Sequence, residues 1–176
     1  MMLSGDTRGA LPVFEHAMSM DPSMTEARFN RAVALLKLGE NEKASSEFEK
    51  IAFDEHNMLR ASAAYHDALA LERLGRVNDA ITWTDRALAL DNQFDSALLL
   101  AGALRERTGQ VDAAARSYYS YLQRHPDSID AMLRFGICAQ RADRIDVARA
   151  YLKKVVAAAP DSPQAAEARK FLVMWE

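Results

Sequence analysis

Small and large apolar side chains recur along the chain at spacings of three and four residues, which is the spacing of one face of an α-helix. The same order appears five times: an alanine, a larger side chain four residues later, and a further apolar or small side chain three residues beyond that one. The alanines are Ala10, Ala44, Ala80, Ala114 and Ala148. This pattern predicts five amphipathic helices with one face buried.

Each of these helices is preceded by a residue suited to a tight turn, five positions before its alanine. The turn residues are Gly5, Gly39, Gly75, Gly109 and Asp143, with spacings of 34, 36, 34 and 34 residues. Four of the turns follow another stretch of helical pattern, in which two small residues stand five positions apart. These small residues are Ala27, Ala63, Ala97 and Ala131, and then Ala32, Ala68, Gly102 and Gly136. The sequence therefore predicts a repeated helix-turn-helix unit whose two helices approach closely.

A 34-residue helix-turn-helix unit with this order of small, turn and aromatic positions resembles the tetratricopeptide repeat. Proline follows the second helix at Pro22, Pro126 and Pro160, as in that family, whereas His56 and Asn92 hold the place elsewhere. The resemblance implies an all-α fold, a right-handed superhelical solenoid of helix-turn-helix units, in a single array over residues 1–176. We expect a half repeat at 1–24, full repeats at 25–58, 61–94, 95–128 and 129–162, and a C-terminal capping helix at 163–176.

The amino-acid composition is typical of a helical chain and gives no reason to expect a nucleic-acid partner. The 176 residues include 32 alanines but only 12 glycines and prolines, which favours helix. The formal charge is -3, so there is no general basic excess to neutralise phosphates, and we expect no nucleic-acid partner. The longest nearly apolar run, 97–104, is too short to span a membrane. No feature assigns a compartment, so a soluble, cytoplasmic location is the default expectation.

Motifs for catalysis or cofactor binding are missing from the sequence. There is no phosphate-binding loop, dinucleotide fingerprint, nucleophile elbow or zinc-protease motif. The single cysteine, Cys138, lies where other units have small apolar residues, so we expect it in the core. The histidines fall in different units and are expected to be solvent-exposed: His16, His56, His66 and His125. These observations predict that the chain is not an enzyme and holds no cofactor or metal.

The resemblance also implies that the first helix of each unit lines the concave surface. Projecting these helices places a set of mainly apolar side chains on a groove floor: Phe29, Val33, Leu36, Tyr65, Leu69, Leu99, Ala103, Leu133 and Ile137. A basic residue follows in every full unit: Lys37, Arg73, Arg107 and Arg141. An apolar strip with a charged edge suits a peptide or amphipathic helix with acidic groups. Alternatively, these basic residues contact no partner and instead interact favourably with the negative end of the helix dipole, at the C-terminus of each first helix.

One known binding mode of the family is excluded by the residues at its positions. Members that hold the carboxylate terminus of chaperones use a clamp of lysine, asparagine and further basic residues. The matching places here are Phe29, Val33, His66, Ser96 and Leu100, or in the next window Tyr65, Leu69, Leu100, Asp130 and Arg134. The sequence therefore predicts a protein-protein interaction scaffold that takes a partner peptide or helix in another way.

Two other functions remain open from the sequence. Residues 1–24 and 25–58 each carry a formal charge of -2, whereas 129–162 carry +2. This difference, with apolar residues near both ends, is compatible with weak head-to-tail self-association into a structural assembly. The end residues are Phe14, Ala17 and Met18, and Phe171, Leu172, Met174 and Trp175. The chain could also be the regulatory repeat portion of a larger protein or enzyme.

Overall fold

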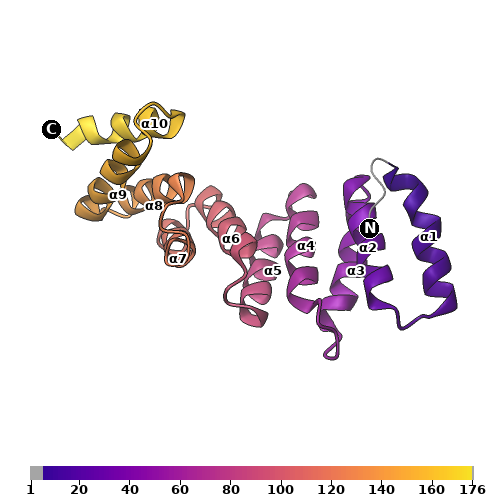
Figure 1. Cartoon of the computed structure of the whole chain (residues 1–176). Coiled ribbons are helices and arrows are strands. Elements are labelled where there is room, and N and C mark those ends of the chain that lie inside the picture. Colours follow the sequence, from indigo (N-terminus) through magenta and orange to yellow (C-terminus); the bar gives the residue numbers. More distant parts are fainter. Residues whose placement is uncertain (1–5, 176) are drawn as a thin grey trace. The chain divides into compact units, whose positions relative to one another are not determined.

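The computed structural model describes residues 6–175, which form ten α-helices, one short 3₁₀ helix and no strand (Figure 1). The predicted all-α fold is therefore confirmed. We call α2, α4, α6 and α8 the first helices, and α3, α5, α7 and α9 the second helices that follow them. The helices are α1 (Thr7–Met20), α2 (Thr25–Lys37), α3 (Asn41–Phe53), α4 (Arg60–Arg73), α5 (Val77–Leu90), α6 (Asp95–Arg107), α7 (Val111–Leu122), α8 (Ile129–Arg141), α9 (Ile145–Ala158), α10 (Pro163–Leu172) and η1 (Val173–Trp175).

The helices form two compact units, Met1–Phe94 and Asp95–Glu176. In the first unit, α1 to α5 pack in chain order and α2 also packs against α4. In the second unit, α7 packs between α6 and α8, while α10 packs against both α8 and α9. Each unit is thus a stack of helix-turn-helix pairs, and in the first unit the successive first helices α2 and α4 contact one another. No helix within residues 6–175 has the length and apolar character needed to cross a membrane.

The turns inside the helix pairs have the backbone that the glycine spacing predicts. Gly39, Gly75 and Gly109 have φ angles of 82°, 76° and 77°, and Asp143 has 58°. At the first of these turns, Gly39 N donates to Leu36 O at 3.2 Å and Glu40 N donates to Leu35 O at 3.0 Å. This pair of bonds satisfies the last carbonyl groups of α2. Gly5, the remaining predicted turn residue, lies outside the described residues.

Small residues inside the helix pairs permit close approach, as the sequence predicts. Ala44, Ala80, Ala114 and Ala148 are all completely buried. Gly102 of α6 lies directly against the ring of Tyr118 on α7, where an added Cβ would stand 2.6 Å from Tyr118 Cε1. The predicted small positions are therefore the places where helix meets helix.

Aspartates form the turns that follow α1, α3 and α5, and the last two of these turns have no proline. The Oδ1 atoms of Asp21, Asp54 and Asp91 each accept a hydrogen bond from the backbone N–H two residues on, at 2.9, 3.1 and 2.9 Å. Such a bond closes a turn without the ring constraint of proline. It accounts for the tolerance of His56 and Asn92 where other units carry proline.

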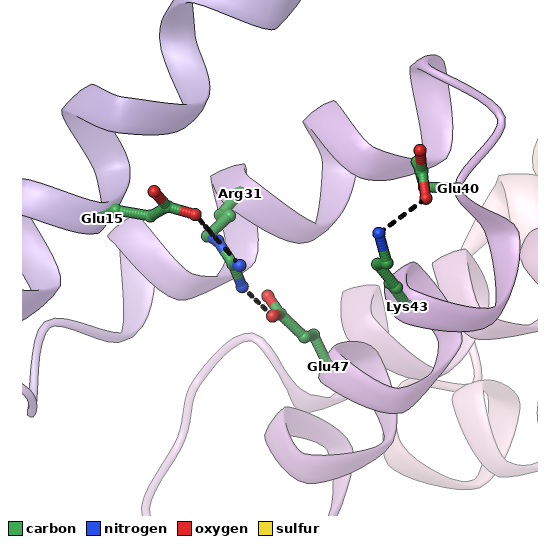
Figure 2. A network of polar contacts seen from close by, with 5 residues as sticks. All are labelled: Glu15, Arg31, Glu40, Lys43 and Glu47. Atoms are coloured by element: carbon green, nitrogen blue, oxygen red, sulfur yellow. Dashed lines mark hydrogen bonds and ion pairs between the residues drawn. The ribbon is translucent and has the colours of Figure 1, made fainter.

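A network centred on Arg31 joins the first three helices (Figure 2). Arg31 Nη2 of α2 donates to Glu15 Oε1 of α1 at 3.2 Å, and Arg31 Nη1 pairs with Glu47 Oε1 of α3. The second carboxylate oxygen of Glu47 is buried without a hydrogen-bond partner among the described residues. Because α1 fully buries none of its side chains, this network is a principal polar link between α1 and the rest of its unit.

Candidate functional site

In the first unit, α2 and α4 bring together most of the apolar residues predicted to contact a partner. Phe29 and Val33 of α2, and Tyr65 and Leu69 of α4, are half-buried and so retain accessible surface. Leu36 is buried and belongs to the core. Of these five predicted residues, Phe29, Val33, Tyr65 and Leu69 keep accessible surface, whereas Leu36 does not.

An aromatic cluster lies in this part of the first unit. The Phe29 ring is 5.6 Å from that of Phe48 and 5.2 Å from that of His66, measured between ring centroids. His66 lies 5.3 Å from Phe48 and 5.2 Å from Tyr65, and Tyr65 is 5.0 Å from Phe94. Phe48 of α3 is completely buried, so it packs beneath the half-buried rings of Phe29 and His66.

His66 is not the solvent-exposed residue that the sequence analysis expected. It is half-buried in the aromatic cluster, and its burial lowers its pKa. Nδ1 lies 2.8 Å from the carbonyl oxygen of Ser62, which can only accept, so this nitrogen carries the proton. In the neutral ring Nε2 is therefore a hydrogen-bond acceptor. The expectation was also wrong for His125, which is half-buried and pairs with Asp95 at 2.6 Å, whereas His16 and His56 are exposed.

A buried carboxyl lies next to this cluster and was not identified from the sequence. Asp67 is 1% exposed, and its Oδ1 accepts a hydrogen bond from Ser45 Oγ at 2.5 Å. Burial raises the pKa of Asp67 to about 6, with a smaller contribution from Glu49, while the Ser45 hydrogen bond and Arg76 oppose the increase. The helical spacing of Ala63, Asp67 and Leu71 is the signal that could have located it on the buried face.

In the second unit, the predicted floor residues are more deeply buried. Leu99 of α6 is half-buried, but Leu133 and Ile137 of α8 are buried. Both belong to a core cluster that includes Ala168 of α10, with Phe171 packed against it. These two α8 residues stabilise the second unit and present little surface to a partner.

A carboxylate occupies the basic part of the second unit. Glu106 Oε1 lies 3.5 Å from Arg134 Nη1 and 3.9 Å from Arg141 Nη1, and Glu106 Oε2 accepts a bond from Tyr118 Oη at 3.2 Å. Cys138 is buried nearby, and its pKa is raised to about 12 by burial, with a smaller contribution from Glu106. The predicted core position of Cys138 is confirmed. Arg141 faces a carboxylate of its own unit.

The four predicted basic residues are all exposed: Lys37, Arg73, Arg107 and Arg141. Arg73 has a structural contact as well, since its Nη1 donates to the carbonyl oxygen of Leu36 at 2.6 Å. The Leu36 carbonyl, which also accepts from Gly39 N, thus has a second donor, and the bond joins the C-terminal end of α4 to that of α2. Two of these four basic residues lie in each unit, at the ends of its first helices.

The accessible side chains described above can offer a ligand apolar contact and hydrogen bonding. Half-buried rings and aliphatic chains supply apolar area, and His66 supplies an acceptor. In the part of the chain covered by the structure, no three His, Cys, Asp or Glu side chains are grouped as a metal site requires. The predicted apolar residues that keep accessible surface therefore lie mainly on the first helices of the first unit.

Comparison with known proteins agrees with the helical pairs and turns described above. The chain is 29% identical over 168 residues to human protein O-mannosyl-transferase TMTC1, covering 90% of this chain but 18% of that relative. It therefore spans about a fifth of the length of this curated relative. Two solved structures have the same fold. MamA has a TM-score of 0.75 at 22% identity, with 89% of this chain and 84% of that one covered.

The second solved structure is YrrB, described as a TPR protein with an unusual peptide-binding site. Its TM-score is 0.75 at 21% identity, with 94% of this chain and 84% of that one covered. The sequence profile of the tetratricopeptide repeat matches residues 1–72 and 107–170 of this chain. These matched ranges make up more than half of the sequence, and the chain therefore belongs to the tetratricopeptide repeat family.

Proposed function

We propose that the chain is a non-catalytic protein-protein interaction scaffold, whose first helices take a peptide or helix of a partner in an apolar, basic-edged concave groove. The observation that carries the proposal is the set of half-exposed apolar side chains on α2 and α4, namely Phe29, Val33, Tyr65 and Leu69. Exposed basic residues follow them on the same helices. Membership of a family of interaction scaffolds and the peptide site of the YrrB structure support this assignment.

Affinity in this proposal comes mainly from apolar burial. Half-buried aromatic side chains lose little conformational freedom when a partner covers them, because their own helices already restrict them. The basic residues Lys37, Arg73, Arg107 and Arg141 orient the partner and raise the association rate more than the affinity. Buried Leu36, Leu133 and Ile137 hold the first helices in place.

The test is a comparative pull-down with the parent chain and a Tyr65→Ala, Leu99→Ala double variant. Truncating an interface anchor costs about 2 kcal/mol or more, so the true partner should be lost from the variant while its helical circular dichroism is retained. Val13→Ala, at an exposed residue of α1, is the matched control and should retain the partner. A partner held equally by the double variant but lost on changing second-helix residues would contradict the proposal.

End-to-end self-assembly is the second candidate function, and exposed apolar side chains favour it. Val13 and Met20 of α1 are 64% and 75% exposed, and Met174 after α10 is 67% exposed. Residues 1–94 carry 10 basic and 15 acidic side chains, whereas 95–176 carry 12 and 10. Opposite charges at the two ends would attract neighbouring molecules. Sedimentation velocity from low to several hundred micromolar protein, at two salt concentrations, tests this candidate; a monomer throughout would exclude it.

The third candidate is a repeat portion that serves a larger protein. The match to 18% of the length of human TMTC1, a protein named as a transferase, favours it. The repeats would then recruit or position a partner for an activity located elsewhere. Immunoblotting a lysate of the source cells with an antibody against this chain would show the mass of the natural product, and a single band at 19.6 kDa would exclude the candidate.

A further inference from the structure

Three half-buried side chains of the first unit lie together, with Phe29 and Tyr65 each in contact with His66. We call them the aromatic face: Phe29 of α2, and Tyr65 and His66 of α4. The rings of Phe29 and Tyr65 each approach His66 edge-on, with centroid distances of 5.2 Å. Buried Phe48 supports both Phe29 and His66 from α3. Because rings held in this way are pre-organised, a ligand ring can pack on them with little loss of side-chain freedom.

The aromatic face carries one hydrogen-bonding group of defined polarity. Nδ1 of His66 donates to Ser62 O at 2.8 Å, which is the one polar contact of this ring among residues 6–175. Burial lowers the His66 pKa, so the ring is neutral at pH 7.5. Nε2 is then a hydrogen-bond acceptor. A ligand that covers it without supplying a donor leaves it unsatisfied, which is unfavourable.

Exposed basic residues follow the aromatic face along the same two helices, α2 and α4. Arg73 follows His66 by seven residues and Lys37 follows Phe29 by eight, and both basic residues are exposed. At 1.5 Å per residue these separations are about 10 to 12 Å along the helix axis. Half-buried Val33 and Leu69 lie between the aromatic face and the basic residues in sequence. An extended peptide advances about 3.3 Å per residue, so three residues cover this distance.

We propose that the aromatic face is a subsite for a tyrosine or tryptophan side chain of an extended peptide, which also has an acidic residue three positions away, placed at Lys37 and Arg73. The inference rests on the peptide-binding function proposed above. The ligand ring packs against Phe29 and Tyr65, and its O–H or N–H donates to His66 Nε2. The acidic residue complements the two exposed cations. A phenylalanine peptide has the ring but not the donor, so the face discriminates against it.

The test uses synthetic seven-residue peptides of glycine and serine, each with an aromatic residue and a glutamate three positions apart, in both orders. Tyrosine and phenylalanine versions are titrated at pH 7.5 into the ¹⁵N-labelled full chain, and binding is followed by chemical shifts of α2 and α4. We expect the tyrosine peptide of one order to bind on the order of fivefold more tightly than its phenylalanine counterpart. Replacing glutamate by glutamine should weaken binding of the tyrosine peptide. Equal affinity of tyrosine and phenylalanine peptides in both orders would overturn the proposal.

Variants of His66 assign the preference to this residue. His66→Phe keeps a ring but removes the acceptor, so the tyrosine preference should disappear while the phenylalanine peptide binds as before. His66→Gln keeps an acceptor and should retain part of the preference, which guards against a general loss of folding in the first variant. His56→Phe is the matched control, since the His56 side chain is 98% exposed. A tyrosine preference that survives His66→Phe would overturn the proposal.

The outcome also separates this inference from the broader function. If no peptide shifts α2 or α4, yet a natural partner is lost from the Tyr65→Ala, Leu99→Ala variant, the subsite is wrong and the scaffold function stands. If the peptides shift only residues outside the first helices, and the natural partner is insensitive to that variant, both proposals fail.

Discussion

Ser45 Oγ donates a hydrogen bond to Asp67 Oδ1 over 2.5 Å, which joins α3 to α4 through a carboxyl that is 1% exposed. The pKa of this carboxyl is raised from 3.8 to about 6, chiefly by burial. The folded chain therefore binds a proton at Asp67 more tightly than the unfolded chain does. Stability from this group is highest at acid pH and falls as the pH rises from about 4 through about 6.

Replacing this carboxyl by an amide should stabilise the chain at neutral pH. We expect Asp67→Asn to raise the free energy of unfolding at pH 7 by about 1 to 3 kcal/mol, because each pKa unit corresponds to about 1.4 kcal/mol. The gain should shrink toward pH 4. His66 acts in the opposite direction in both proteins, since its lowered pKa reduces stability below about pH 6.5.

Urea unfolding of the parent and Asp67→Asn across pH 4.5 to 7.5 measures this effect, because the difference between the two curves removes the shared contribution of His66. Asp127→Asn, at an exposed carboxyl, is the control and should leave the parent curve nearly unchanged. A difference curve for Asp67→Asn that is flat with pH would contradict the assigned role of this carboxyl.

Two ion pairs drawn in Figure 2 should differ in their importance for stability. Arg31→Met removes the partner of Glu47, whose side chain is 18% exposed, and we expect a loss of about 2 kcal/mol. Lys43→Met breaks the exposed pair with Glu40, at 2.9 Å, and should cost less than about 0.5 kcal/mol. Chemical denaturation measures both losses. Glu47→Gln should recover part of the stability in the Arg31→Met protein, and equal losses for the two single variants would oppose this account.

The turn between α8 and α9 should be improved by glycine. Asp143 has a φ of 58°, where the corresponding turns have glycine. A left-handed backbone costs a residue with a side chain about 1 kcal/mol, so Asp143→Gly should raise the free energy of unfolding by up to about that amount. The reverse change, Gly75→Asp, should lower it. Thermal melts measure both changes. Melting temperatures that both rise or both fall would contradict this explanation.

The thiol of Cys138 should serve as a reporter of opening in the second unit. Burial raises its pKa to about 12 and excludes reagent, and the thiolate is the reactive form. We expect almost no alkylation by iodoacetamide at pH 8 in the native chain, and rapid reaction in urea. Ser120→Cys adds an exposed thiol on α7 and should react at once. Equal native rates for the two thiols would show that Cys138 is accessible.

The fold could be predicted from the sequence because its determinants recur. A residue with positive φ at the turn and a small side chain inside the pair are both local requirements, and both repeat at Gly39, Gly75 and Gly109 and at the buried alanines. The repeat boundaries remain a proposal, since helix limits alone do not define where one repeat ends and the next begins.

The candidate site was only partly predictable. Projection along one helix gives the direction of Leu133 and Ile137, but not the helix α10 that packs against α8 and contributes to the same core cluster. The burial of His66 and Asp67 likewise depends on Phe29 and Ser45, which come from other helices. Contacts between elements distant in sequence therefore decide which of the predicted residues keep accessible surface.

The contact between Gly102 and Tyr118 limits which first helices could be exchanged between repeats of this chain. Gly136 meets Leu152 in the same manner in the next pair, where an added Cβ would stand 2.9 Å from the leucine side chain. A first helix carrying alanine at this place could not be transplanted onto α7 without displacing the tyrosine ring. Exchange of first helices between repeats is therefore restricted at this one position: α8, which has Gly136 there, avoids the clash with Tyr118, whereas α2 and α4, which have Ala32 and Ala68, do not.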